Sequence, residues 1–81
     1  MRVTVLCFAS AQDAAGCPEL SLEINEGSTV GDAVTTLVAG HPGLRPLIPR
    51  LRFAVDTEFV GESAALHNGC TLALLPPMSG G

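Results

Sequence analysis

The sequence contains no lysine, and its only fixed cations are four arginines: Arg2, Arg45, Arg50 and Arg52. Against eight acidic residues they leave a net charge of −4 at pH 7. Proteins that bind nucleic acid or anionic membranes do so through basic surfaces. No apolar run approaches the roughly 20 residues that span a bilayer. The composition therefore predicts neither a nucleic-acid partner nor a membrane partner.

Aromatic residues are also scarce. There is no tryptophan and no tyrosine among the 81 residues, and there are only three phenylalanines. Because 47% of the residues are hydrophobic, the chain can build the core of one small domain and is too apolar to be disordered. That core must be mainly aliphatic.

The three cysteines, Cys7, Cys17 and Cys70, form no disulfide framework, because their number is odd. Their spacing fits neither a zinc site, which needs paired short spacings, nor an iron–sulfur cluster. We expect Cys7, which lies in an apolar strand, to be a buried and inert thiol. These features predict a cytoplasmic protein that itself binds no metal or cofactor.

The first residues have the outline of a short signal peptide, with an apolar run before Ala9-Ser10-Ala11. The positive region is a single arginine, however, and the apolar run is at the lower length limit. Cleavage would also remove the best strand of a small core. We therefore expect this segment to belong to the folded domain.

The order of the predicted elements indicates an α+β domain. Apolar and alternating patterns predict strands over 2–9, 19–24, 52–55, 59–60 and 71–75. We expect residues 10–18 to form a loop with room for one helical turn, residues 41–51 an irregular link, and Asn68-Gly69 a tight turn. A mixed sheet of about five strands, with one main helix on one face, accommodates this order.

One segment carries clear helix signals. Thr29 is the expected N-cap, and Asp32 lies three residues further on, as in a capping box. Gly40 is expected at the C′ position, and Pro42 should prevent any continuation. The apolar residues between these ends recur at helical spacing: Val30, Ala33, Val34, Leu37 and Val38.

Strand alternation predicts an apolar patch on the sheet face that the helix leaves uncovered. Val3, Val5 and Cys7 are expected to face the helix, as are Leu72 and Leu74. The residues between them then point away from it: Leu6, Phe8, Ala73 and Leu75. Leu75 lies near the C-terminus, and a contiguous apolar patch beside a candidate functional end of the chain suggests a docking surface. A loop folded over that face is the structural alternative.

The chain ends at Gly80-Gly81, directly after Pro76-Pro77-Met78-Ser79. Two residues without Cβ atoms can enter a narrow channel and present a carboxylate at its far end. Extended, residues 78–81 would reach roughly 13–14 Å. Because the proline pair ends the last strand, we expect a domain over 1–77 and a flexible tail over 78–81. A frayed or truncated terminus is the alternative.

Several segments resemble the small, sulfur-carrying subunits of molybdopterin synthase, the MoaD family. The ending of two prolines, an apolar residue, serine and two glycines is the most specific of these. The resemblance implies a ubiquitin-like β-grasp fold, which agrees with the element order above. The matching segments are Val5-Leu6-Cys7-Phe8-Ala9, Gly27-Ser28-Thr29-Val30, Ala54-Val55-Asp56 with Phe59-Val60, Leu66-His67-Asn68-Gly69, and Leu72 to Gly81.

The resemblance implies sulfur carriage through the C-terminal glycine. An E1-like enzyme would adenylate the Gly81 carboxylate with ATP, and a sulfur donor protein would convert the product to a thiocarboxylate. Gly80 and Gly81 would then enter the large subunit, in a heterotetramer with both subunits in duplicate, and deliver sulfur to cyclic pyranopterin monophosphate. Catalytic groups would belong to the partners. The implied partner-binding residues are Phe8, Phe59, Leu75, Pro76, Pro77, Met78 and Ser79.

The sequence departs from the family pattern in several places. Gln12-Asp13 stands where the family often has Arg-Glu, which would remove an ion pair to the large subunit. Asp56 replaces the usual asparagine, and Met78 replaces valine. His67 and Cys70-Thr71 replace more acidic residues. None of these changes touches the Gly-Gly chemistry, but they leave the identity of the partner open.

Other functions share the same fold and ending. A carrier for thiamine thiazole or another sulfur product would use the same tail chemistry. A ubiquitin-like modifier would join Gly81 to lysines of other proteins, and a plain β-grasp binding module would use no C-terminal chemistry. The sequence does not decide which activating enzyme or sulfur donor serves the chain, or whether free chains self-associate.

Overall fold

The elements follow one another in the predicted order, with additional helical segments between the strands. The computed structural model describes residues 1–77, and the predicted tail, 78–81, lies outside the described residues. In chain order the elements are β1 (Arg2–Cys7), α1 (Ser10–Ala15), β2 (Glu19–Glu23), α2 (Val30–Gly40), the 3-10 helix η1 (Pro42–Arg50), β3 (Arg52–Val55), β4 (Glu58–Val60) and β5 (Thr71–Leu75).

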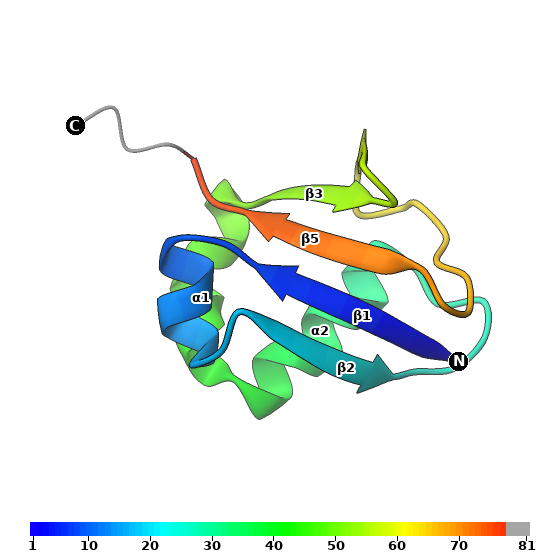
Figure 1. The fold of residues 1–81 in the computed structure, drawn as a ribbon, viewed down its shortest axis with the longest axis horizontal. Coiled ribbons are helices and arrows are strands. Elements are labelled where there is room, and N and C mark those ends of the chain that lie inside the picture. Colours follow the sequence, from blue (N-terminus) through cyan, green and yellow to red (C-terminus); the bar gives the residue numbers. More distant parts are fainter. Residues whose placement is uncertain (78–81) are drawn as a thin grey trace.

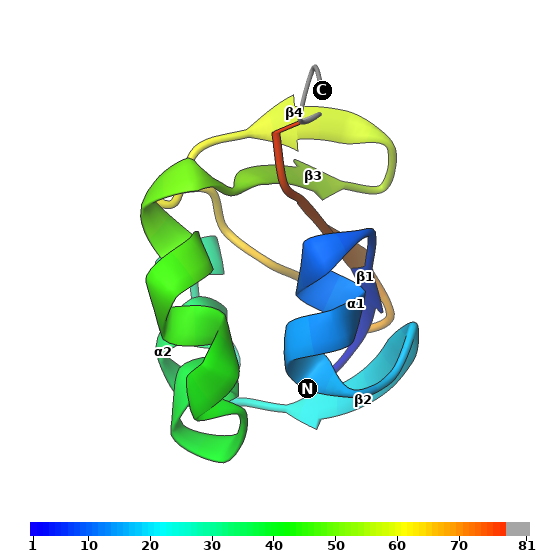
Figure 2. The ribbon, with the colours of Figure 1, turned by 90° about the vertical axis from the view of Figure 1, so that its left-hand side faces the viewer.

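β1 lies inside the sheet and pairs with both the next strand and the last one. The strand order across the sheet is β2-β1-β5-β3-β4 (Figure 1). β1 runs parallel to β5, and every other neighbouring pair is antiparallel. The predicted mixed sheet of five strands is therefore confirmed. The helical segments lie against one side of it, as Figure 2 shows.

The core lies between the sheet and these helices. The side chains of β1 and β5 that face the helices are almost completely buried: Val3, Val5, Cys7, Leu72 and Leu74. They pack with the apolar stripe of α2 and with Leu44 of η1. This burial confirms the predicted alternation along both strands. Among the described residues, Phe53 is the one aromatic side chain in the cluster, so the core is mainly aliphatic as expected.

α2 begins with the predicted capping box. Thr29 Oγ1 accepts a hydrogen bond from the Asp32 N–H (3.2 Å), and the Asp32 carboxylate accepts one from the Thr29 N–H (2.9 Å). The two bonds satisfy amides that have no partner within the helix. Within residues 1–77, no helix is long and apolar enough to cross a bilayer.

Residues 10–18, expected to form a loop with room for one helical turn, contain the helix α1. It ends at Gly16, which takes the left-handed conformation (φ 82°) and donates its N–H to Gln12 O (2.9 Å). Its alanines favour helix formation, and Ala11 and Ala15 are buried against the core. Six residues are too few for helical periodicity to be visible in the sequence.

The proline-rich segment 41–51 is a 3-10 helix and not an irregular link. Pro42 begins η1, at a position where the missing N–H costs nothing. The expectation for Gly40 is also corrected, because α2 continues through Gly40 and His41 follows it, with the His41 N–H bonded to Leu37 O at 2.7 Å. Packing explains the order of η1 despite its internal prolines, since three of its side chains contact the core: Leu44, Leu47 and Ile48.

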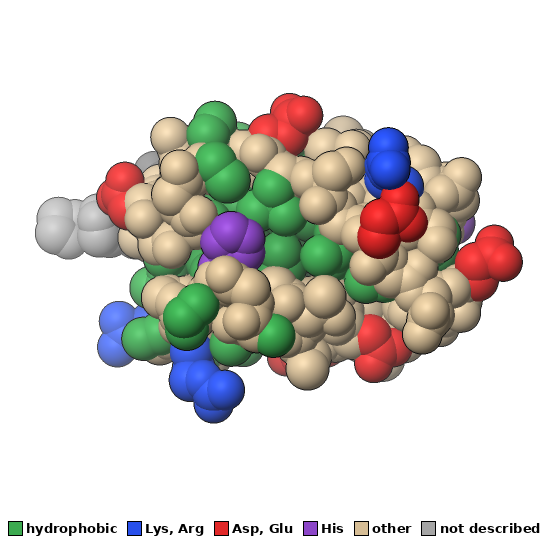
Figure 3. All heavy atoms as spheres, turned by 90° about the horizontal axis from the view of Figure 1, so that it is seen from below, with side chains coloured by type: hydrophobic (Ala, Val, Ile, Leu, Met, Phe, Trp, Pro, Cys, Tyr) green, Lys and Arg blue, Asp and Glu red, His purple; other side chains and the backbone are tan. Residues whose placement is uncertain are grey.

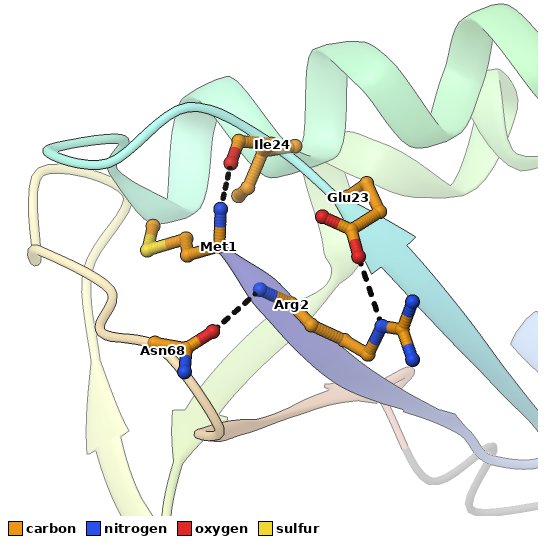
Figure 4. A network of polar contacts seen from close by, with 5 residues as sticks. All are labelled: Met1, Arg2, Glu23, Ile24 and Asn68. Carbon is orange, nitrogen blue, oxygen red and sulfur yellow. Dashed lines mark hydrogen bonds and ion pairs between the residues drawn. The ribbon is translucent and has the colours of Figure 1, made fainter.

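Polar contacts hold the first residues in the sheet (Figure 4). The Met1 ammonium donates to Ile24 O (2.6 Å), and the Arg2 N–H donates to Asn68 Oδ1 (2.8 Å). Gly69 takes the left-handed conformation (φ 84°) and donates its N–H to Arg2 O (2.8 Å). The tight turn predicted at Asn68-Gly69 is therefore confirmed, and it helps to anchor the start of β1.

Replacing the cap of α2 is expected to destabilise the domain. Thr29→Ala removes the hydroxyl that accepts from Asp32 and should lower the free energy of unfolding by about 1 kcal/mol. Thr35→Ala is the matched control, because the Thr35 hydroxyl is exposed and only donates back to Gly31 O. Since alanine favours helix more than threonine does, the control should keep or slightly raise stability. Urea denaturation measures both, and an equal loss in the two variants would contradict the role of the cap.

Candidate functional site

The sheet face opposite the helices carries a shallow apolar hollow. Phe8, Phe59 and Leu75, the three predicted docking residues with side chains on this face, all line it. Phe8 is 44% exposed and Phe59 is 68% exposed. No described segment covers them, so the alternative of a loop folded over this face is not observed in residues 1–77. The remaining lining residues are Leu6, Ala54, Asp56, Thr57, Thr71 and Ala73.

Backbone contacts position Phe8 at the border of the hollow. Its N–H donates to Leu74 O (3.3 Å), which continues the β1–β5 ladder by one step. Its carbonyl accepts from the Ala11 N–H (2.9 Å), at the start of α1. Ala9, between these two anchors, has a positive φ of 49°. The strand therefore ends sharply, and Phe8 stays on the open face beside the end of β5.

A hairpin brings Phe59 to the same hollow from the other side. β3 and β4 are joined through Asp56 and Thr57, both at positive φ (47° and 74°), as a tight two-residue turn requires. Phe59 then lies opposite Ala54, and Ala54 lies opposite Ala73 of β5. The Arg52 guanidinium lies 5.6 Å from the Phe59 ring centroid, within the range of a cation–π contact.

Two of the departures from the family pattern contact each other at the rim of the hollow. Asp56 Oδ1 accepts a hydrogen bond from the Thr71 N–H (2.9 Å). Asp56 Oδ2 lies 3.2 Å from His67 Nε2. The Asp56 N–H in turn donates to Thr71 O (2.9 Å). These contacts tie the β3–β4 turn to the start of β5 and to the loop before it.

The root of the tail lies against α1 and η1. Pro76 and Pro77 line a second small hollow together with Ser10, Leu47 and Arg50. Leu75, which lines the apolar hollow, directly precedes Pro76, so two prolines separate this hollow from the first residue of the tail. Sequence reasoning did not single out Arg50, and its position in a proline-rich segment contained no signal for it. The predicted site residues Met78, Ser79, Gly80 and Gly81 lie outside the described residues.

Two of the three cysteines, Cys7 and Cys70, are buried in the core. Cys7 is 2% exposed, as expected, and Cys70 is 1% exposed. Burial raises the pKa of the Cys7 thiol, and the nearby Cys17 adds to the rise. A raised pKa leaves less of the nucleophilic thiolate. In the described part of the chain, no three potential ligands among His, Cys, Asp and Glu gather as a metal site would require.

Comparison with known proteins decides the family. A sequence profile of the ThiS family matches residues 5–81. The chain belongs to the ThiS family. It is 34% identical to a protein of Chlamydomonas reinhardtii named molybdopterin synthase sulfur carrier subunit, over the full length of both chains (100% and 100%). The resemblance to such sulfur carrier subunits is thereby confirmed.

An archaeal relative and its structure confirm the fold of this ThiS-family chain. Small archaeal modifier protein 1 of Haloferax volcanii is 36% identical, over 91% of this chain and 94% of the relative. The crystal structure of SAMP1 from Haloferax volcanii superposes with a TM-score of 0.92 at 28% identity, covering 100% of each chain. The chain therefore has the ubiquitin-like β-grasp fold that its resemblance implied.

Thiol reactivity should follow burial. In the native protein we expect an aromatic disulfide reagent to label Cys17, the partly exposed thiol, well before Cys7 and Cys70. After denaturation all three should react at similar rates, because the burial that raises the pKa of Cys7 is lost. Peptide mass mapping after timed quenching identifies the labelled residue. Labelling of native Cys7 as fast as Cys17 would contradict this placement.

Proposed function

We propose that this chain is the sulfur carrier subunit of a molybdopterin synthase, with the C-terminal carboxylate of Gly81 as the carrying group. The observation that supports it most directly is positional. The apolar hollow on the open sheet face is lined by Leu75, three residues before the tail begins at Met78. A partner that covers this hollow therefore receives the tail as well. The full-length similarity to a named sulfur carrier subunit supports the same function.

The proposed chemistry takes place at the end of the tail. The ionised carboxylate of Gly81 attacks the α-phosphate of ATP within an E1-like activating enzyme, and pyrophosphate leaves. The terminal sulfur of a donor persulfide then attacks the acyl carbon and displaces AMP, giving an acyl disulfide. A thiol attacks the donor's sulfur of this disulfide, which releases the thiocarboxylate and leaves a disulfide between the thiol and the donor. The large synthase subunit finally accepts the tail, and the sulfur passes to cyclic pyranopterin monophosphate. This chain supplies the carboxylate and its delivery, and the partners supply the acids, bases and phosphate-binding groups.

The apolar hollow is suited to repeated docking. Full burial of a Phe or Leu side chain contributes about 1.5–3 kcal/mol. Phe8, Phe59 and Leu75 together could therefore offset part of the cost of association, which amounts to at least about 4 kcal/mol. Met78 to Gly81 add a reach of roughly 13–14 Å when extended, enough to enter an active site behind the interface. Glycine at positions 80 and 81 keeps the end of this segment narrow.

A second candidate function is protein modification. The similarity to small archaeal modifier protein 1, at 36% identity, favours it. Adenylation of Gly81 would come first here too, but a lysine amine of a target protein would then attack the acyl carbon and form an isopeptide bond. Because this chain contains no lysine, it could not form lysine-linked chains with itself. The two functions differ in product, since one yields a thiocarboxylate and the other a conjugate. A carrier for another sulfur product, such as thiazole, would differ only in its final acceptor.

The docking residues should affect binding and not folding. Phe8→Ala and Phe59→Ala should each weaken binding to the large subunit at least about tenfold, equivalent to about 1.4 kcal/mol, because both rings are exposed in the free chain. Ile48→Ala is the control, since it shortens an apolar side chain on η1, outside the hollow. Isothermal titration calorimetry measures affinity, and thermal melting measures the fold. Unchanged affinity in both phenylalanine variants would refute this docking surface.

Gly81 should be indispensable for sulfur loading. Its deletion shortens the tail by roughly 3.5 Å, and a misplacement of about 1 Å can already cost 100-fold in rate. Incubation with ATP, an activating enzyme and a sulfur donor should raise the intact mass of the wild type by one oxygen-to-sulfur exchange, located on the C-terminal peptide. The Gly81 deletion and Gly80→Val should remain folded and gain no sulfur.

A variant without cysteine is the matched control for this experiment. Cys7→Ala, Cys17→Ser and Cys70→Ala together should still allow the mass gain, although loss of the buried thiols can lower the melting temperature. A mass gain in the Gly81 deletion, or its loss in a folded cysteine-free variant, would overturn the C-terminal mechanism. If wild type instead forms conjugates with lysine-bearing proteins and no thiocarboxylate, the modifier function replaces the carrier function.

A further inference from the structure

The outer edge of β2 is a second surface that the proposed function does not use. β2 ends the sheet on one side, and β4 ends it on the other. Among the described residues, no strand pairs with the outer side of either. β4 has three residues, whereas β2 has five in a regular alternation. An exposed regular edge is a template for an additional strand, and a longer edge provides more hydrogen bonds.

The backbone of β2 is oriented for such pairing. The Cys7 N–H donates to Pro18 O (2.8 Å), and the Ile24 N–H donates to Met1 O (3.0 Å). With the β1–β2 register, these bonds place the amides of Leu20 and Leu22 toward β1. The N–H and C=O groups of Glu19, Ser21 and Glu23 therefore point outward, along the free edge. They are spaced two residues apart, as the ladder of a neighbouring strand requires.

Apolar side chains accompany the edge on the helix side. Leu20 and Leu22 are opposite Val5 and Val3, which face the core, so they share that face. They are only partly buried, and Cys17 and Ile24, which flank β2 in the chain, are likewise partly exposed. Figure 3, which views the molecule from the side where β2 borders the sheet, shows hydrophobic side chains in a band along this side, with a histidine at the band, several acidic side chains around it and arginines at the lower left and upper right. An added strand would find apolar contacts there for every second residue.

The acidic side chains of β2 favour a basic segment as the strand that pairs with its edge. Glu19 and Glu23 point to the opposite face and are exposed. If two copies of β2 paired antiparallel about Ser21, Glu19 of each copy would lie opposite Glu23 of the other, and like charges directly opposite are destabilising. A segment with basic residues at those positions would be attracted. Arg2 offsets the negative charge of Glu23 alone, through an exposed ion pair at 2.9 Å. Beyond the end of β2, Asp32 adds a further negative charge in a hollow that Ile24 and Thr35 also line.

We propose that β2 binds an extended segment of another protein as a sixth strand, with that segment's apolar side chains directed toward α2 and its alternate lysine or arginine side chains directed toward Glu19 and Glu23. The surface is separate from the apolar hollow, since none of the residues lining the hollow belongs to β2. Glu19 nevertheless lies opposite Leu6, which lines the hollow, so the two surfaces are neighbours on the open face of the sheet.

A short peptide tests this directly with the full-length chain. The probe is a fluorescein-labelled heptapeptide in which lysine alternates with valine, and fluorescence anisotropy measures its affinity. Amide hydrogen exchange should slow at Ser21 and Glu23, whose N–H groups face the edge. Glu19→Lys should weaken binding about fivefold, because it replaces an attraction for the peptide's lysines with a repulsion. A peptide with glutamate in place of lysine should bind at least as poorly.

Glu58→Lys is the matched control, because it changes the net charge equally but lies on the other edge, in β4. It should weaken the lysine–valine peptide less than about twofold. Ser21→Pro, which removes one outward N–H at an edge position that tolerates proline, should also abolish binding. If Ser21→Pro unfolds the domain, the comparison of Glu19→Lys with Glu58→Lys still tests the proposal. Equal weakening by Glu19→Lys and Glu58→Lys, or exchange protection outside β2, would refute the proposal. A dimer of the free chain in which the β2 amides are protected from hydrogen exchange would also refute the proposal, because β2 would then pair with β2 of a second copy.

Discussion

The parallel pairing of β1 with β5 is the contact on which the rest of the structure depends. It joins the first strand of the chain to the last, in a register that sets Leu6 beside Ala73 and Cys7 beside Leu74. One face of this pair forms the centre of the core, and the other face forms the floor of the apolar hollow. Closing so long a loop costs entropy, which the burial of Val5, Leu72 and their neighbours offsets.

The same pairing separates stability from docking. The helix-facing side chains of β1 and β5 are buried and hold the domain together. The outward-facing ones form the floor of the hollow, beside which Phe8 and Phe59 stay exposed. Because Leu75 ends β5 at the border of the hollow and Pro76 follows at once, the proposed docking surface and the proposed tail are joined by only a few residues of the chain. Neither phenylalanine belongs to the core, so this surface can serve binding with little effect on the fold.

Contacts at the rim explain two residues that look unusual in sequence. Asp56 occupies a turn position with positive φ (47°), which aspartate tolerates better than most residues. From there its carboxylate contacts both the Thr71 amide and His67. The proposed use of the β2 edge adds a surface on the far side of the sheet order from β4. In these two proposals the sheet binds one partner through its open face and another through its β2 edge.

Local patterns in the sequence determined much of this structure. The strands, the capping box at Thr29 and Asp32, and the turn at Asn68-Gly69 depend on neighbouring residues, so they could be predicted. The resemblance carried by the segments up to Gly81 gave the family, which the profile match confirms. Only room for one helical turn was predicted where α1 forms, because the helix is too short for periodicity, and η1 was missed because its prolines conceal an apolar face that only packing reveals.

Tertiary structure alone decided how the site is assembled. Phe8 and Phe59 meet because β5 pairs with both β1 and β3, and β4 folds back beside β3. Tertiary packing also decides three further features: the burial of Cys70, the contact between Asp56 and His67, and the position of Arg50 beside the proline pair. Alternation along a strand shows which residues share a face, but strand order and register are set by contacts between residues far apart in the chain.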